Sequence, residues 1–74
     1  MLTLLVKYTA KPGSREKYVD QVISSGLLDA IRAENGCLRY DYYFSVQEEN
    51  VILLVEQWES ETLQQEHMQH PNMA

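Results

Sequence analysis

The sequence predicts an α+β fold in which helices pack on an antiparallel sheet arranged as a split βαβ unit. Two observations support this prediction. Segments with strand-like and helix-like periodicity follow one another in the order strand, helix, strand, strand, helix. The two consecutive strands are joined by a short polar turn, which is typical of an antiparallel hairpin. The chain of 74 residues has room for one domain, so we expect residues 1–74 to form a single unit.

The first strand is predicted from Leu2 to Ala10, because its side chains alternate between two faces. One face carries Leu2, Leu4, Val6 and Tyr8, and the other carries Thr3, Leu5, Lys7 and Thr9. Lys11-Pro12-Gly13 ends this strand, since proline has no N–H to donate and glycine permits a turn. Ser14 is then placed to cap a helix.

A helix is predicted from Arg15 to Ala33, because apolar residues recur at intervals of three and four. These residues are Tyr18, Val19, Val22, Ile23, Leu27, Ala30 and Ile31. Ser24-Ser25-Gly26 weakens the middle of this helix, so we expect a bend or a break there. Glu34-Asn35-Gly36 ends it, because Asn and Gly tolerate the left-handed backbone that closes a last turn.

Two extended apolar runs form the predicted hairpin, with the polar turn at residues 47–50. In the first run, one face carries Leu38, Tyr40, Tyr42, Phe44 and Val46, and the other carries Cys37, Arg39, Asp41, Tyr43 and Ser45. In the second run, one face carries Val51, Leu53 and Val55, and the other carries Ile52, Leu54, Glu56 and Trp58. Both faces of the second run are mainly apolar, so this strand needs two covers, one of which can come from another subunit.

A second helix is predicted to start at Ser60 and to stop at Pro71, with Leu63, His67 and His70 on one side. A split βαβ unit normally closes with a fourth strand beside the first. The residues after Pro71 are too few to form that strand. We therefore expect the chain to be the front part of a longer domain, incomplete at its C-terminal strand.

Charge and cysteine content restrict the expected partners and location. Six basic residues and a net charge of −5 argue against nucleic acid, because phosphate backbones require a Lys/Arg-rich surface. The single cysteine, Cys37, excludes an internal disulfide framework and fits a cytoplasmic protein. No apolar segment approaches the roughly 20 residues of a membrane span, so we expect no membrane partner. The expected ligand is a small molecule.

Three residues are candidates for catalysis, and each has a structural alternative. Trp58 could stack on a planar ligand or anchor its strand to a helix. His67 could act as a general base, since an ordinary imidazole has a pKa near 6.5, or it could be a hydrogen-bonded structural histidine. Glu56 could shuttle protons if it is buried, or it could pair with Arg39 or Lys7 on a neighbouring strand.

Other polar residues give weaker signals. Tyr40 and Tyr42 could line a pocket through their hydroxyls or lie at the sheet and dimer surface. His67 and His70 are too few ligands for a metal site, so we expect no metal. Cys37 is expected to be a small buried apolar residue.

Three motifs in register suggest a family. They are GCLRY at residues 36–40, EQWES at residues 56–60 and EHMQHPNM at residues 66–73. With these motifs the whole chain resembles the antibiotic biosynthesis monooxygenase family, and their spacing is similar to that of its quinol monooxygenase and quorum-signal-degrading branches. The resemblance implies a ferredoxin-like subunit that forms a dimeric α+β barrel through its sheet faces, with a pocket between sheet and helices in each subunit.

The resemblance implies a monooxygenase that oxidises a small quinol-like or phenolic substrate without a cofactor. Two alternatives stay open, an isomerase or degrader of a small signalling molecule and a non-catalytic dimeric ligand-binding domain of the same fold. The catalytic residues would be His67, Trp58 and Glu56, and the substrate-binding residues would be Leu54, Leu63, Tyr40 and Tyr42.

The sequence departs from the family pattern at two positions. The cofactor-free oxygenases of antibiotic pathways carry Asn where this chain has Leu54 and Tyr where it has Gln64. Of that trio, only Trp58 is present here. The axial histidine and first-strand asparagine of the haem-cleaving members also have no counterpart, so the resemblance implies no haem.

Overall fold

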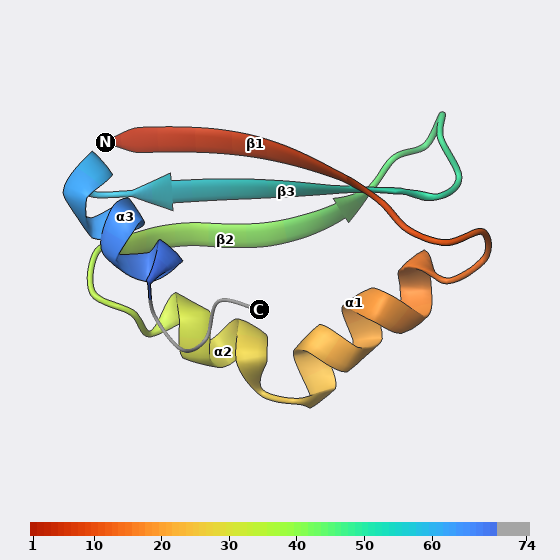
Figure 1. The fold of residues 1–74 in the computed structure, drawn as a ribbon, viewed down its shortest axis with the longest axis horizontal. Helices are drawn as coiled ribbons and strands as arrows, with labels where there is room; N and C mark the ends of the chain where they lie inside the picture. The colour runs from red at the N-terminus through yellow and green to blue at the C-terminus, as the bar shows by residue number, and fades with distance from the viewer. Residues whose placement is uncertain (70–74) are drawn as a thin grey trace.

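A computed structural model describes residues 1–69, which contain three strands and three helices in the predicted order (Figure 1). The elements are β1 (Leu2–Thr9), α1 (Arg15–Ser24), α2 (Leu27–Arg32), β2 (Cys37–Phe44), β3 (Val51–Trp58) and α3 (Glu61–Met68). This arrangement confirms the predicted α+β fold. His70 and the predicted helix stop at Pro71 lie outside the described residues.

The strands form one sheet in the order β1-β3-β2, with β3 antiparallel to both neighbours. Pairing in this register places side chains in four rows across the sheet on the face that packs against the helices. The rows are Tyr8–Ile52–Phe44, Val6–Leu54–Tyr42, Leu4–Glu56–Tyr40 and Leu2–Trp58–Cys37. The last two rows hold two predicted site residues on β3, Glu56 and Trp58, side by side along one strand.

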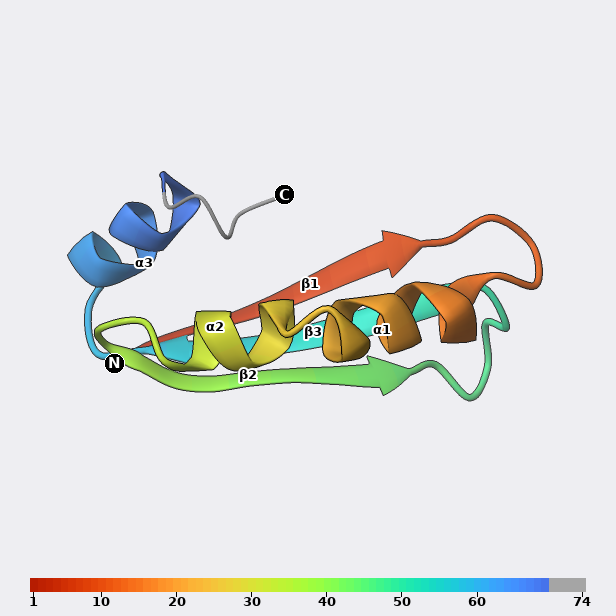
Figure 2. The ribbon, with the colours of Figure 1, turned by 90° about the horizontal axis from the view of Figure 1, so that it is seen from below.

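The predicted break in the first helix is confirmed. Gly26 adopts a left-handed backbone with φ of 82° and separates α1 from α2. Ser25 Oγ donates to the Val22 carbonyl and accepts from the Leu27 amide at 3.4 Å, so this side chain satisfies backbone groups on both sides of the break. Figures 1 and 2 show α1 and α2 following each other along one side of the sheet, while α3 lies at the end where β3 finishes.

The predicted face of Leu38 is wrong. The pairing of β2 with β3 shifts between Cys37 and Arg39, so that Cys37 stands opposite Trp58 and packs against the core. Leu38 is the extra residue of this β-bulge, and 52% of it is exposed. The strand also ends at Phe44, two residues before Val46. A bulge moves every side chain before it to the other face, which explains why strict alternation fails here.

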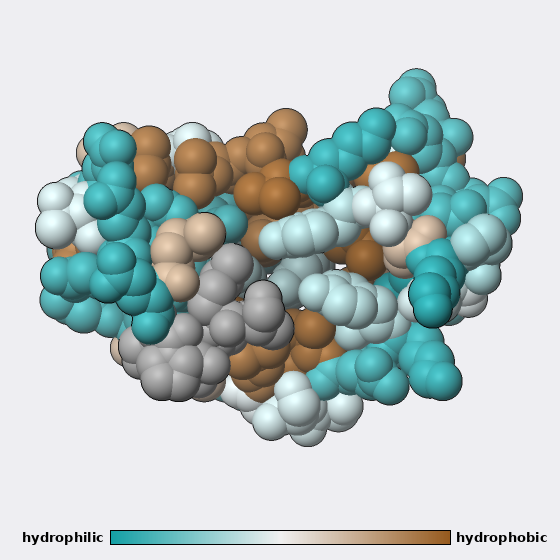
Figure 3. All heavy atoms as spheres, in the orientation of Figure 1, coloured by the Kyte–Doolittle hydropathy of each residue, from teal (hydrophilic) through white to brown (hydrophobic). Residues whose placement is uncertain are grey.

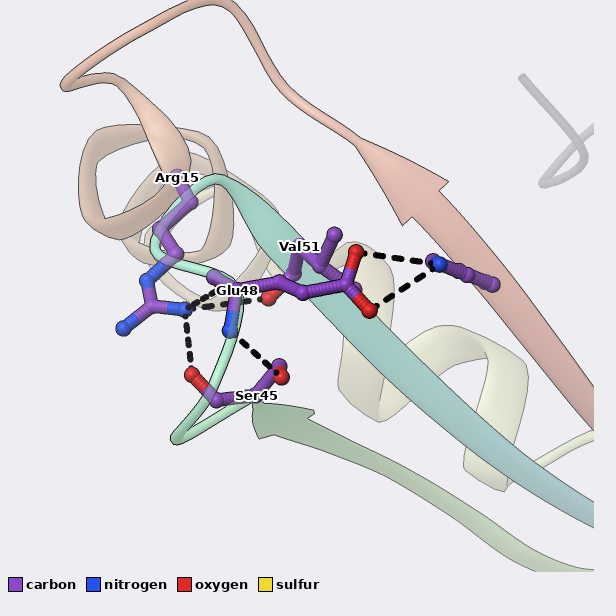
Figure 4. A network of polar contacts seen from close by, with 5 residues as sticks. Arg15, Ser45, Glu48 and Val51 are labelled. Carbon is purple, nitrogen blue, oxygen red and sulfur yellow. Dashed lines mark hydrogen bonds and ion pairs between the residues drawn. The ribbon is translucent and has the colours of Figure 1, made fainter.

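The turn between β2 and β3 is fastened to the start of α1. Arg15 Nη1 lies 2.9 to 3.1 Å from the carbonyl oxygens of Ser45, Glu48 and Val51, to which it donates (Figure 4). The guanidinium also lies over the ring of Phe44, 4.6 Å from its centroid. One side chain thus fixes the far end of the hairpin relative to the helix layer.

The core lies between the helices and the sheet, toward the end where α3 lies. It consists of Val22, Leu28, Ile31, Tyr40, Leu54 and Trp58. The opposite face of the sheet has no helix of residues 1–69 packed on it, and Leu5, midway along the edge strand β1, is 71% exposed. None of the described helices is long and apolar enough to cross a membrane.

Candidate functional site

Trp58 is the last residue of β3. It lies on the face of the sheet that packs against the helices, and it is completely buried. Its indole Nε1 donates to Glu56 Oε1 at 3.1 Å. Glu56 lies two residues earlier on the same strand, and it is also buried. Because side chains two apart on a strand share a face, the carboxylate meets the indole without any distortion of β3.

The alternative that Glu56 pairs with Arg39 or Lys7 is wrong. Those cations lie on the opposite side of the sheet, where Lys7 Nζ pairs with Glu48 at 3.1 Å and Arg39 Nε pairs with Asp41 at 2.8 Å. The Arg39 guanidinium is also the first cause of a lowered pKa at the Asp41 carboxyl. The helix-facing carboxylate therefore bonds to an aromatic N–H instead of a cation.

His67 comes from α3 and stacks on Trp58. The ring centroids are 4.8 Å apart and the planes differ by 28°. Tyr40 contacts the His67 ring edge to face, and the centroids of these two rings are 5.8 Å apart with planes at 69°. Only 2% of His67 is exposed. The structure therefore brings together the three predicted catalytic residues and the predicted substrate-binding residue Tyr40.

The other contact of the imidazole is with Glu34, which the sequence did not suggest as a site residue. His67 Nδ1 lies 2.9 Å from Glu34 Oε1 and 3.0 Å from Oε2. A carboxylate only accepts hydrogen bonds, so the proton between these groups belongs to Nδ1. In the neutral ring the lone pair is then on Nε2, which is the basic nitrogen.

Glu34 lies in the short loop between α2 and β2, and this loop is held against the start of α3. The Gly36 carbonyl accepts from the Glu59 amide at 2.9 Å, and Gly36 has a φ of 84°. A Cβ atom on Gly36 would stand 2.9 Å from Leu63 Cβ, which is inside contact distance. The Ser60 hydroxyl caps α3 as predicted, accepting from the Leu63 amide at 3.2 Å.

The remaining predicted substrate-binding residues divide between the core and its edge. Leu54 is completely buried, and Tyr42 meets Tyr40 edge to face with centroids 5.9 Å apart. Burial, followed by the nearby Tyr18, raises the pKa of Tyr42 to about 12, and burial likewise raises the pKa of Tyr40. Leu63 borders a recess of about 230 Å³ whose other lining residues are Glu34, Asn35, Glu66 and His67.

A larger cavity, of about 350 Å³, lies at the other end of the sheet. Its lining is Tyr8, Thr9, Ala10, Lys11, Ser14, Tyr18 and Ile52. Ile52 and Trp58 are six positions apart on β3, which is about 20 Å at the usual rise of a strand. Figure 3 shows this side of the molecule hollowed between the sheet and the helices. Neither His67 nor Trp58 lines this cavity.

No cluster of three or more His, Cys, Asp or Glu side chains that could hold a metal ion occurs among residues 1–69. His70, the second histidine of the predicted helix, lies outside that range. Cys37 is half-buried, and burial, with help from Glu34 and Glu56, raises the pKa of its thiol. The thiol form is a poor nucleophile, so Cys37 behaves as an apolar core residue.

Comparison with known proteins gives matches over nearly the whole chain. The family model described as antibiotic biosynthesis monooxygenase matches residues 1–74. A Bacillus subtilis (strain 168) protein named "Putative monooxygenase YcnE" is 33% identical over 67 residues, covering 90% of this chain and 68% of its own.

Solved structures share the fold. The crystal structure of PA3566 from Pseudomonas aeruginosa is similar with a TM-score of 0.78 and 28% identity, covering 96% of this chain and 70% of that one. A Deinococcus radiodurans structure, titled "putative antibiotic biosynthesis monooxygenase", gives a TM-score of 0.84 at 19% identity over 99% of this chain and 70% of that one. At 19% identity, the similarity to the Deinococcus radiodurans structure shows a shared fold and no more.

Proposed function

The chain belongs to the antibiotic biosynthesis monooxygenase family, and on this premise we propose that it oxidises a small quinol-like or phenolic substrate with dioxygen and without a cofactor. Membership supports a monooxygenase-like function. The substrate class and the absence of a cofactor are the parts that we add, and both rest on the residues around His67.

The observation that supports this proposal is the environment of His67. Its Nε2 is the basic nitrogen of a ring held between Trp58 and Glu34, beside the edge of Tyr40. In this proposal, Nε2 takes the hydroxyl proton of the substrate. The resulting anion then gives up electrons to dioxygen, so that one oxygen atom bonds to a ring carbon to give a hydroxyquinone and the other leaves as water. Aromatic rings on two sides of the imidazole suit a planar substrate better than a flexible aliphatic one.

Access to His67 requires movement of α3. Trp58 is completely buried and His67 nearly so, and the recess beside them is smaller than a typical ligand pocket of about 300 Å³ or more. Helix α3 has eight residues and joins β3 through the short segment at Ser60. We propose that the substrate enters at the recess bordered by Leu63 while α3 shifts outward, as closing elements do in many enzymes.

The test is oxygen uptake with a menadiol-type hydroquinone. We expect turnover by the parent protein and a loss of about 10²- to 10⁴-fold in His67→Ala, the usual effect of removing a general base. The thermal midpoint of each variant is measured in parallel. A rate that is unchanged in His67→Ala contradicts this proposal, and an equal loss of folding and rate assigns His67 a structural role.

One observation favours a second function, that of a small-molecule-binding domain. The cavity of about 350 Å³ is large enough for a small ligand and is lined by Tyr8 and Tyr18, while His67 and Trp58 are packed as core residues. This function predicts that the hydroquinone binds, as measured by calorimetry, while no oxygen is consumed.

A further inference from the structure

We propose that Glu34 is a positioning residue that holds His67 in the tautomer with its proton on Nδ1, which leaves Nε2 as the base. The consequence for catalysis rests on the function proposed above. The tautomer itself does not, because it is a property of the free protein.

The geometry leaves the imidazole one orientation. Both carboxylate oxygens of Glu34 approach Nδ1, at 2.9 and 3.0 Å, and the side chains of Glu34 and His67 are 8% and 1% exposed. The stack on Trp58 sets the plane of the ring, and the edge of Tyr40 closes another side. A ring flipped by 180° would present carbon instead of Nδ1 to the Glu34 carboxylate, and both contacts with Nδ1 would be lost.

The backbone of Glu34 is also held in place. Its amide donates to the Ile31 carbonyl at 3.0 Å, and its carbonyl accepts from the Cys37 amide at 3.2 Å. Two residues later the loop touches α3 through Gly36 and Leu63. The carboxylate therefore reaches His67 from a constrained loop, so little backbone entropy opposes the contact.

The two buried carboxylates near the stacked rings have different partners. Glu56 is hydrogen-bonded to the indole of Trp58, while Glu34 is hydrogen-bonded to the imidazole of His67. Among the hydrogen bonds of the described residues, the contact with Glu34 is the one that distinguishes Nδ1 from Nε2. In histidine sites generally, the bond made by one ring nitrogen determines which tautomer is present.

The experiment is nitrogen-15 NMR of the histidine side chains at pH 8, without substrate. The signals of His67 are assigned by comparison with His70→Gln. We expect the Nδ1–H tautomer in the parent and a clear decrease of that tautomer in Glu34→Gln and Glu34→Ala. Glu59→Gln, which removes the same charge from an exposed position at the same end of the sheet, is expected to leave the tautomer unchanged.

Kinetics give the second readout. Glu34→Gln should lower kcat at least about 10-fold with little change in KM, because the ring then also adopts the tautomer in which Nε2 carries the proton, and Glu34→Asp should recover part of the rate. An unaltered tautomer in both Glu34→Gln and Glu34→Ala overturns the assignment. If the parent consumes no oxygen, the proposed function fails, but the tautomer measurement still decides the role of Glu34.

Discussion

Two buried carboxylates each hold an aromatic ring at the same end of the sheet. Glu56 accepts from Trp58, and Glu34 accepts from His67. Burying a carboxylate is costly unless hydrogen bonds replace its lost water, and the two ring N–H groups provide such bonds here. The stacked pair of rings is therefore fixed from both sides by neighbouring acids.

Tyr42 leads to a prediction about alkaline pH. Its pKa is raised to about 12 in the folded protein, mainly by burial, whereas an unfolded tyrosine titrates near 10. Burial thus favours the neutral hydroxyl. The corresponding stability is complete below pH 10 and is lost as the pH rises from about 10 through 12.

We therefore expect the thermal midpoint to fall between pH 10 and 12, and to fall less steeply in Tyr42→Phe. Thermal unfolding followed by circular dichroism at several pH values measures this slope. Tyr43→Phe, on the opposite face of β2, is the matched control. Equal slopes for the parent and for Tyr42→Phe would contradict the assignment.

At the scale of elements, the contact between the α2–β2 loop and α3 depends on the absence of a side chain at Gly36. Gly36 and Gly13 both have a left-handed backbone, with φ of 84° and 77°, but a Cβ atom at Gly13 would meet nothing within 4 Å. Alanine at either position bears the cost of the left-handed backbone, about 1–2 kcal/mol. At Gly36 it also overlaps Leu63.

We expect Gly36→Ala to lower the free energy of unfolding by at least about 1 kcal/mol more than Gly13→Ala does. Urea unfolding of both variants measures this difference. Combining Gly36→Ala with Leu63→Ala should remove only part of the excess, because Cγ and Cδ1 of residue 63 are then gone but its Cβ still lies 2.9 Å from the added methyl group. Equal losses at the two glycines would show that Leu63 moves aside freely.

Local sequence patterns predicted most of the elements. Period-two alternation located the strands, and Ser24-Ser25-Gly26 marked the break between α1 and α2, because a left-handed residue needs glycine. The bulge at Leu38 was missed, since no glycine or proline marks the extra residue. Ser14 does precede α1, but its hydroxyl donates to the Lys11 carbonyl instead of capping the helix.

The site was predictable only where its residues share a strand. Glu56 and Trp58 lie two positions apart on β3, so alternation alone places them on one face. Glu34 and His67 are 33 positions apart, and their contact depends on where α3 docks. No periodicity encodes that docking, so the sequence identified His67 but not its carboxylate.

At the scale of the whole molecule, the sheet has one face without helices from residues 1–69. Apolar side chains from two neighbouring strands meet on this face, where Leu5 of the edge strand β1 stands opposite Val55 of the central strand β3. An uncovered apolar sheet face favours association. We propose that the chain forms a homodimer through this face, as the family resemblance also implies.

Sedimentation at micromolar concentration tests the dimer. We expect the parent to sediment as a dimer and Leu5→Lys to sediment as a monomer, because a lysine beside Val55 would place a charge in the apolar interface. Ile23→Lys is the control, since Ile23 is also exposed but lies on α1, in the helix layer. A parent protein that is monomeric under these conditions contradicts the proposal.

The bond between Glu34 and His67 has a consequence for the order of folding. These residues stand on either side of the segment that contains β2 and β3, so their approach closes a long loop. Closing such a loop is entropically costly until the hairpin has formed and has drawn its two ends together. We therefore expect helix α3 to dock last, after β2 and β3 have paired, and to stabilise the hairpin through the bond between Glu34 and His67.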